Sequence, residues 1–391
     1  MGLPDATPDA SANASANAPL VLYGMTSGVS ARGFIAGQAP FLRDHGWRVA
    51  LVCSDEGDVA RFAGEEGIEY LPVDLARNPS VRQDLRGVVG LWRVLRRTRP
   101  AATVWGSPKA SLLGVALCRA LGIPSVYLIH GLRLEGSTGL RRLVLRVAET
   151  VTCRLATVVV SDGLELRALA ERLRLAPAGR IRVLAQGSAN GVGPHAAAPF
   201  YRRALGIDVD AVVVTFAGRI TRDKGVRELA RAWQWVSARR PEAHLVVAGR
   251  VDGPDPMGPG LEEGLRSMPR THLLGHIDDL DRLWADSDVC VLPSYREGLP
   301  LVVIEAAAAG VPAVVCDFTG GRETVLDHQT GRVVPRRDVT ALAHALDELI
   351  GDEHLRERLG RAARERALQN YDRPRLWAAL EATLTEIRGT R

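Results

Sequence analysis

The fold is decided by residues 289–317, which read VCVLPSYREGLPLVVIEAAAAGVPAVVCD. Two short apolar runs, 289–292 and 312–316, predict buried strands of a parallel sheet that helices cover on both faces. Between them, residues 301–309 predict an alanine-rich helix, which ends at Gly310 because glycine readily adopts the left-handed conformation that closes a helix. The stretch therefore predicts a β-α-β unit and an α/β fold class.

Two glutamates in this stretch suggest a ligand. Glu305 lies in the middle of the apolar helix, where a carboxylate is costly unless it binds something, and Glu297 lies in the preceding loop. Pro300 fits the first turn of the helix, so the backbone N–H groups of Gly298 and Leu299 are available to an anion. Carboxylates suit sugar hydroxyls and a helix N-terminus suits phosphate, which together indicate a nucleotide sugar. Taken alone, this stretch fits a second interpretation equally well, in which Glu305 is a salt-bridged acid of the core and Glu297 is a solvated loop residue.

Length and charge bound the class of protein. A chain of 391 residues is long for one domain, and 46% apolar residues are ample for two cores. The net charge of +5 is unevenly spread, because residues 80–182 carry 18 basic residues against 6 acids. Such a surface favours an anionic partner such as phosphate or a membrane, although a solvated arginine-rich face would look the same. Only two of the 50 basic residues are lysines, Lys109 and Lys224.

The cysteines and apolar runs indicate a cytoplasmic protein, with peripheral contact at the inner face of a membrane as a further expectation. None of the five cysteines forms a CxxC pair, which favours small core residues over zinc ligands or disulfides. We find neither the pattern of a signal peptide nor an uncharged apolar run long enough to span a bilayer. Residues 1–18 are small and polar and predict a disordered tail.

Strands and helices alternate along residues 19–195, which predicts a first domain built on an open parallel sheet with helices on both faces. Ligands of such sheets bind at the carboxyl ends of the strands. Three features share that edge: the loop 24–33, after which a helix opens near Phe34, and then Lys109 and His130. A lone histidine after a strand is more often structural than catalytic, and its weight comes from the shared edge. The predicted strands are 20–23, 49–53, 70–73, 102–105, 124–129, 157–160 and 181–184.

A second alternation occupies residues 196–370 and predicts a second domain of the same kind. After its first strand, the loop GRITRDKG holds Arg219 and Lys224 five residues apart. Two cations there could hold a diphosphate and stabilise it as it leaves, whereas a turn with solvated charges is the alternative. We favour phosphate binding, because this loop and the loop of Glu297 follow strands of the same domain.

Neither a metal ion nor another cofactor is predicted. The triplets DVD (208–210) and DSD (286–288) have the DxD pattern that can bind a metal together with a nucleotide. Each triplet precedes a strand, whereas such a site should follow one, so we expect turn and cap residues. The histidines also lack the spacing of metal ligands.

At the level of whole motifs the chain resembles a known family. The segments GRITRDKG (218–225) and PSYREGLPLVVIEAAAAGVP (293–312) resemble the two signature segments of family 4 glycosyltransferases, including the spacing of their glutamate pair. The segments 107–131 and 187–193 resemble bacterial members that build surface polysaccharides and lipid-linked glycans. The resemblance covers residues 20 to about 370.

The resemblance implies a GT-B architecture, in which two Rossmann-like domains face each other across a cleft and the last segment, 371–391, crosses back to the first domain. It implies a retaining transfer of a sugar from a nucleotide sugar, with UDP the expected nucleotide, without a metal ion. The expected acceptor is a hydroxyl of a lipid-linked glycan precursor or of a small molecule.

The resemblance also assigns roles to residues. Arg219 and Lys224 would neutralise the diphosphate, Glu297 would bind the donor sugar, and His130 would lie at the acceptor side of the cleft. The N-terminal loop departs from the family's GG form, since Gly28 is followed by valine, which puts its phosphate contacts in doubt. The expected substrate-binding residues are Gly28, Lys109, Gly218, His276, Ile277, Gly298, Leu299, Pro300 and Glu305, the last at the ribose hydroxyls.

Other classes share parts of this pattern. A glycosyltransferase acting on a soluble natural product, a sugar-nucleotide epimerase and a phosphorylase can have the same architecture, and product analysis with and without an acceptor separates them. A non-catalytic sugar-binding protein needs no diphosphate clamp. A nucleic-acid partner is not expected, because no recognised module or stacking platform is present. Helices within 80–182 are expected to meet an anionic membrane.

Overall fold

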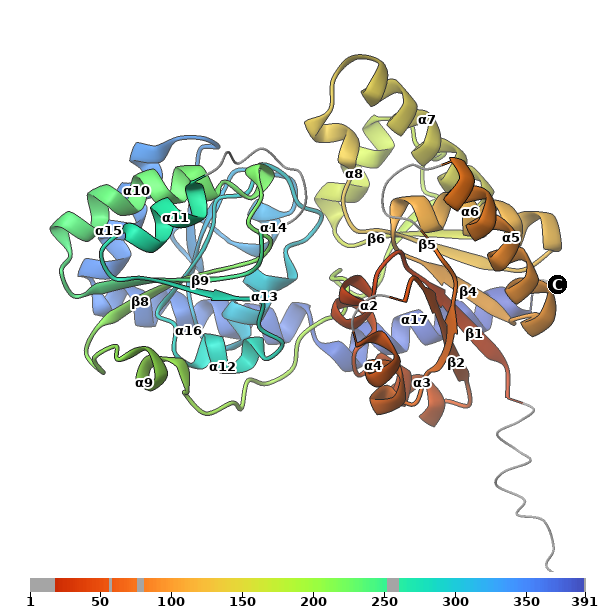
Figure 1. Ribbon diagram of the computed structural model, residues 1–391, viewed down its shortest axis with the longest axis horizontal. Helices are drawn as coiled ribbons and strands as arrows, with labels where there is room; N and C mark the ends of the chain where they lie inside the picture. The colour runs from red at the N-terminus through yellow and green to blue at the C-terminus, as the bar shows by residue number, and fades with distance from the viewer. Residues whose placement is uncertain (1–17, 56–57, 76–80, 252–259, 390–391) are drawn as a thin grey trace, which may run out of the picture.

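The computed structural model describes residues 18–55, 58–75, 81–251 and 260–389, so that the predicted disordered tail lies almost wholly outside the described residues. These residues form two α/β domains, with the N-terminal domain on the right of Figure 1 and the C-terminal domain on the left. Each domain is a parallel sheet with helices on both faces, as the alternation of strands and helices predicts.

The N-terminal sheet has seven parallel strands in the order β3-β2-β1-β4-β5-β6-β7. The chain runs outward from β1 and then returns to β4 on its other side, so β1 and β4 flank the topological switch point. The strands are β1 (Leu20–Gly24), β2 (Arg48–Cys53), β3 (Glu69–Pro72), β4 (Ala102–Trp105), β5 (Ser125–Ile129), β6 (Val158–Ser161) and β7 (Ile181–Val183). The helices are α2 (Gly28–Ile35), α3 (Gln38–Asp44), α4 (Val59–Glu66), α5 (Val81–Thr98), α6 (Pro108–Leu121), the 3-10 helix η1 (Arg133–Gly136), α7 (Gly139–Leu155) and α8 (Leu164–Arg172).

The C-terminal sheet has six parallel strands in the order β10-β9-β8-β11-β12-β13, with its switch point between β8 and β11. The strands are β8 (Val212–Ala217), β9 (Ala243–Ala248), β10 (Thr271–Gly275), β11 (Val289–Leu292), β12 (Ala313–Cys316) and β13 (Gly331–Val334). Its helices are α9 (Tyr201–Leu205), the 3-10 helix η2 (Arg222–Lys224), α10 (Val226–Arg239), α11 (Leu261–Ser267), α12 (Leu280–Ala285), α13 (Leu301–Ala308), α14 (Gly321–Thr324), α15 (Val339–Gly351) and α16 (Glu353–Asn370). The final helix of the chain is α17 (Arg373–Arg388).

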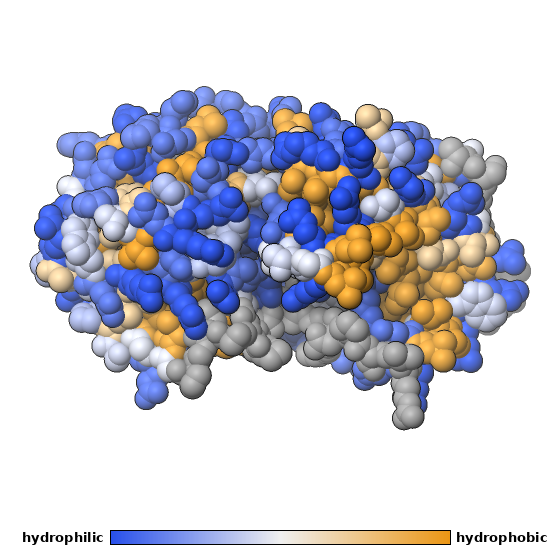
Figure 2. Space-filling model, turned by 90° about the horizontal axis from the view of Figure 1, so that it is seen from above, coloured by the Kyte–Doolittle hydropathy of each residue, from blue (hydrophilic) through white to orange (hydrophobic). Residues whose placement is uncertain are grey.

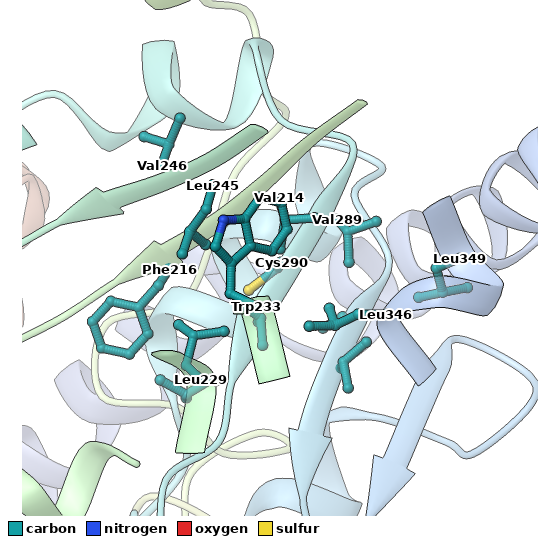
Figure 3. Close-up of a cluster of buried hydrophobic side chains, with 14 of the residues drawn as sticks. Val214, Phe216, Leu229, Trp233, Leu245, Val246, Val289, Cys290, Leu346 and Leu349 are labelled. Carbon is teal, nitrogen blue, oxygen red and sulfur yellow. The ribbon is translucent and has the colours of Figure 1, made fainter. Parts of the chain in front are cut away.

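The stretch 289–317 folds as predicted, into β11, α13 and β12. Its first strand is fully buried, because α10 and α15 cover one face of the sheet and α13 and α16 cover the other. Figure 3 shows Trp233 of α10 lying among the side chains of the neighbouring strands, including Val214 and Cys290. Trp233 has no exposed surface, and burying so large an apolar side chain stabilises a core by roughly 2–3 kcal/mol. The helix layer thereby fixes the positions of the loops that leave the sheet.

The last helix belongs to the N-terminal domain. Figure 1 shows α16 beneath the C-terminal sheet and α17 continuing across to the other domain. There Leu380, Leu384 and Ile387 are buried in a core cluster with residues of β1, β2 and α3. The linker at Val192 runs beside this crossing, since its N–H donates to the carbonyl oxygen of Tyr371 over 2.8 Å. The domains are therefore connected by two segments that run side by side, one at Val192 and the other at Tyr371.

A second set of contacts joins the domains on the side of α8. The carboxylate of Glu323, from α14, accepts hydrogen bonds from the backbone N–H groups of Leu164 and Glu165 at 2.7 and 2.9 Å. In return, Glu165 accepts from the N–H of Gly320 at 2.9 Å. A carboxylate at the positive end of a helix dipole is stabilising, so these contacts hold the two domains close together over the cleft.

The prediction of a loop over residues 24–33 is wrong, because the loop is much shorter. The helix α2 begins at Gly28, inside that loop, and not near Phe34. Ala31 and Ile35 lie one helical turn apart, and both are fully buried against the sheet. Burial of this face outweighs the low helix propensity of the two glycines in the segment. Only residues 25–27 remain as the connection between β1 and α2.

Candidate active site in the interdomain cleft

Two loops of the C-terminal domain lie together at its switch point. The first, 218–225, follows β8, and the second, 293–300, follows the neighbouring strand β11. Gly225 has a φ of 69°, and a Cβ added to it would lie 2.0 Å from the carbonyl oxygen of Pro293. Only glycine allows the two loops to approach so closely, and the approach sets the cations of the first loop against the second.

Two ion pairs cross between these loops. The Lys224 ammonium donates to Oε1 of Glu297, and the two side chains are only 15% and 19% exposed. Nη2 of Arg296 donates to Oδ2 of Asp223 over 2.7 Å. Burial opposes ionisation of Asp223, but a hydrogen bond from Thr221 and the nearby positive charges hold its pKa below the ordinary value. The two ion pairs therefore hold the two loops together.

His130 faces this unit from the N-terminal domain. It follows β5, and its Nδ1 lies 2.9 and 3.0 Å from the two carboxylate oxygens of Asp162, which follows β6. Its ring stacks on Phe34 of α2, with the ring centroids 4.0 Å apart. The other ring nitrogen, Nε2, is buried and has no hydrogen-bond partner within the described chain. Asp162 and Phe34 therefore orient the ring and leave Nε2 for a ligand.

The charged loops and His130 line one cavity of about 400 Å³. It contains six of the residues that the sequence predicts for the site: Lys109, His130, Arg219, Lys224, Glu297 and Gly298. Cations outnumber carboxylates on its walls, which favours an anionic ligand such as a diphosphate. The cations are Lys109, Arg133, Arg219, Lys224 and Arg296, and the carboxylates are Glu135, Asp223 and Glu297.

A second cavity, of about 880 Å³, shares Gly33 with the first. It contains four further predicted residues: Gly28, His276, Ile277 and Glu305. Here the carboxylates outnumber the cations, so this cavity suits an uncharged group rich in hydroxyls better than a phosphate. The carboxylates are Asp58, Asp278, Asp279, Asp281 and Glu305, and the cations are Arg32, Arg250 and Arg373.

Glu305 faces the second cavity, where a ligand could compensate the cost of placing an acid in an apolar helix. It reaches the second cavity from the middle of α13, where the residues on either side of it, Ile304 and Ala306, are buried. Burial raises its pKa to about 7, against the opposing charge of Arg373. Hydrogen bonds from the hydroxyls of a ligand would favour the ionised carboxylate.

Three predicted site residues do not line either cavity. Gly218 turns the chain after β8, with its N–H donating to the carbonyl oxygen of Ala248 over 2.9 Å. Leu299 is only 5% exposed and packs into a core cluster with Ile304, and Pro300 directly precedes α13. These residues shape the loops that carry the cations, and their assignment to substrate binding stays a prediction.

Sequence reasoning missed several residues in and around the first cavity, and four of them organise it. Asp162 and Phe34 orient His130, while Asp223 and Arg296 link the two loops. Asp162 had a usable signal, because it lies two residues after a predicted strand of the same sheet as His130. Arg296 had none, since one more arginine in an arginine-rich chain carries no information about its partner.

In the two DxD triplets, Asp208 lies in a turn and Asp286 caps α9, as predicted, whereas Asp288 contacts the start of β8. Asp286 accepts hydrogen bonds from the backbone N–H groups of Phe200 and Tyr201 at the start of α9. Asp288 accepts from the N–H of Val213, and Asp208 from that of Asp210. No group of three or more His, Cys, Asp or Glu side chains in the described ranges could hold a metal ion. All five cysteines are buried free thiols.

This pair of switch-point loops facing a second Rossmann-like domain defines a glycosyltransferase of the GT-B type. Residues 198–366 match the family model described as glycosyl transferases group 1, and residues 31–187 match the glycosyl transferase 4-like domain. The two matches together span most of the chain, which therefore belongs to the glycosyltransferases.

Individual relatives agree with this class. The chain is 28% identical to the capsular polysaccharide biosynthesis glycosyltransferase CapM of Staphylococcus aureus, over 88% of this chain and 92% of that protein. It is 23% identical to the UDP-Gal:alpha-D-GlcNAc-diphosphoundecaprenol alpha-1,3-galactosyltransferase of Escherichia coli, over 78% and 81% of the two chains. Among solved structures, HepE of Anabaena in complex with UDP and glucose superposes with a TM-score of 0.81 at 19% identity, over 94% of this chain and all of the other. That likeness shows the fold.

Proposed function

We propose that the chain is a retaining family 4 glycosyltransferase that moves a sugar from a UDP-sugar to a hydroxyl of a lipid-linked glycan precursor in polysaccharide synthesis. The observation that carries the proposal is the pairing of a net-positive cavity, lined by Arg219 and Lys224, with an adjoining cavity that holds Glu305. A nucleoside diphosphate sugar has the matching division into an anionic centre and a hydroxyl-bearing nucleoside.

The donor is proposed to lie across both cavities. Its ribose hydroxyls would donate to the carboxylate of Glu305, and its base would lie beside His276 and Ile277. The diphosphate would then reach Arg219 and Lys224, with the backbone N–H groups at the start of α13 directed at it. This order leaves the donor sugar in the first cavity.

Charge stabilisation would supply most of the catalysis. The bond between the anomeric carbon and the diphosphate oxygen breaks, and the two cations take up the negative charge that develops on the leaving group. The acceptor hydroxyl attacks the same face of the sugar, and its proton passes to the leaving phosphate oxygen, so the anomeric configuration is retained. Because side-chain cations neutralise the diphosphate in this scheme, we expect turnover to survive EDTA.

His130 and Asp162 are proposed to position the sugar and the acceptor. With Nδ1–H donating to the Asp162 carboxylate, Nε2 becomes an acceptor for a hydroxyl in the first cavity. Asp162 does not reach the cavity, since it is absent from the lining residues. It acts through His130 by holding the ring in one tautomer and one orientation.

The relatives support the donor and acceptor classes. A galactosyltransferase named for UDP-Gal and a diphosphoundecaprenol-linked sugar aligns along most of the chain, as does a capsular polysaccharide enzyme. A fold neighbour was solved with UDP and glucose. The proposed UDP-sugar and lipid-linked acceptor follow from these likenesses together with the charge pattern of the two cavities.

The test is a turnover assay with product analysis. The purified protein is incubated with UDP-glucose, UDP-galactose or UDP-N-acetylglucosamine, with and without a polyprenyl diphosphate sugar. Acceptor-dependent UDP release, with a product whose anomeric configuration by NMR matches that of the donor, is expected. An inverted anomer would refute the retaining mechanism. Conversion of a UDP-sugar to its epimer without any acceptor would instead establish the epimerase alternative.

A further inference from the structure

The helix α7 carries its apolar side chains on the outside. Its buried residues are Glu149, Thr152 and Cys153, whereas five leucines and valines along one face are exposed by 39–76%. These are Leu140, Leu143, Val144, Val147 and Val151. An ordinary surface helix has the opposite pattern, with its apolar stripe toward the core. The reversed stripe therefore indicates a partner outside the described chain.

The helix α5, on the other side of α6, also carries exposed apolar side chains. Leu85, Val89 and Trp92 are 66%, 36% and 40% exposed. The helix α6 packs against both α5 and α7 and lies between them. Figure 2, which looks at the molecule from the side of α7, shows hydrophobic side chains gathered over the N-terminal half, among hydrophilic ones. We call the exposed side chains of α5 and α7 the docking face.

The charge of the docking face identifies its partner. Eight arginines on α5 and α7 are exposed: Arg86, Arg93, Arg96, Arg97, Arg141, Arg142, Arg146 and Arg154. Among the described side chains, the acids of these two helices add little negative charge to the surface. Asp84 pairs with Lys109, and Glu149 is buried and accepts a hydrogen bond from the hydroxyl of Tyr127. Two copies of this positively charged face would repel each other. An anionic bilayer instead offers negative headgroups for the arginines and an apolar acyl region for the leucines and valines.

We infer that the docking face is the surface on which the protein lies on an anionic lipid bilayer, with α7 embedded in the interface. This inference deepens the proposed function and rests on it, because it specifies how a lipid-linked acceptor is reached. No helix in the described part of the chain is long and apolar enough to cross a membrane.

The docking face also lies next to the acceptor side of the cleft. The N-terminal end of α6 supplies Lys109 to the first cavity, and the turn η1, which directly precedes α7, supplies Arg133 and Glu135. Tyr127 lines the same cavity while donating its hydroxyl to Glu149 of α7 over 2.5 Å. A diphosphate-sugar headgroup could therefore enter the cavity while its lipid chain stays in the bilayer under α7.

Vesicle flotation tests the inference with the intact protein. We expect the wild type to float with phosphatidylcholine vesicles containing about 30 mol% phosphatidylglycerol, to float poorly with phosphatidylcholine alone, and to be partly released by high salt. The double variant L143S/V147S should bind at least about tenfold more weakly, because two apolar side chains no longer enter the interface. The matched control is Val209→Ser, which removes a valine that is 81% exposed on the C-terminal domain and should float like the wild type.

Three outcomes would overturn the inference. The wild type could remain unbound to anionic vesicles, or L143S/V147S could float as well as the wild type. Alternatively, sedimentation could show a dimer that L143S/V147S dissociates, without vesicle binding, which would assign the face to a second copy. Thermal melting should be unchanged in the variant, since both side chains are exposed. Acceptor-dependent UDP release, measured without vesicles, tests the proposed function separately. A failure of vesicle binding and a failure of sugar transfer can therefore be told apart.

Discussion

The sharpest test of the diphosphate site is to remove the Lys224 ammonium. In the proposed reaction this cation stabilises the charge that forms on the leaving phosphate, so Lys224→Ala should lower kcat by about 10²–10³, the usual loss for one stabilising donor. The matched control is Arg222→Ala. Arg222 lies two residues away in the same turn and is exposed outside both cavities. Loss of its charge, screened by solvent, should change kcat by less than about threefold.

The structure also predicts the effect of Lys224→Ala on folding. Its partner Glu297 is only 19% exposed, and the lost charge partner should lower the free energy of unfolding by about 1–3 kcal/mol. The double variant K224A/E297Q removes the stranded charge as well, so stability should recover while turnover stays low. UDP release and calorimetric melting separate the two effects. A Lys224→Ala protein that turns over like Arg222→Ala would refute the role of the ammonium.

Three further predictions concern other parts of the cleft. Burial holds the pKa of Glu305 at about 7 against an ordinary 4.5; ionisation therefore costs folding free energy, and the contribution of this group to stability is full below pH 4.5 and is lost as the pH rises through 7. UDP affinity should rise by roughly tenfold as the pH rises through 7, because the ionised carboxylate is the better acceptor. The terminal phosphate of UDP also ionises near this pH, so calorimetric titration should show a smaller rise in Glu305→Gln than in the wild type; an equal rise in the variant would refute the contact between Glu305 and the ribose. Asp162→Asn should leave UDP binding intact but slow transfer by up to about a hundredfold, because His130 loses its orientation; equal losses in binding and transfer would point to misfolding. Gly225→Ala should lower the melting temperature more than Gly206→Ala, since both glycines have positive φ but only the first would clash, with a carbonyl oxygen 2.0 Å away; equal shifts would show that the loops are free to part.

Local sequence chemistry was sufficient for the architecture. Strands that are buried on both faces read as continuous apolar runs, and Gly310 ends α13 where the sequence indicated. The cations of 218–225 were informative because loops at the carboxyl ends of adjacent strands must meet at a switch point. Glu305 was informative for a different reason: an acid is costly inside so apolar a helix unless a ligand compensates it.

Tertiary pairings were beyond the sequence. The contact between Lys224 and Glu297 joins residues of two loops, and nothing in either loop indicated that one ion pair would unite the two candidates. The partner of His130 depended on the order of β5 and β6 in the sheet. Helices within 80–182 were expected to meet an anionic membrane, but the outward direction of the apolar face of α7 follows only from how α7 packs. Its burial of Glu149 is set by the hydroxyl of Tyr127, on β5.

In the proposed function, one nucleotide sugar spans the two cavities in a fixed direction. A crystal structure of the protein with UDP tests it most directly. We expect the ribose hydroxyls at hydrogen-bond distance from the Glu305 carboxylate and the diphosphate in contact with Arg219 and Lys224. A nucleoside bound in the cavity of His130, or a diphosphate bound away from both cations, would contradict it.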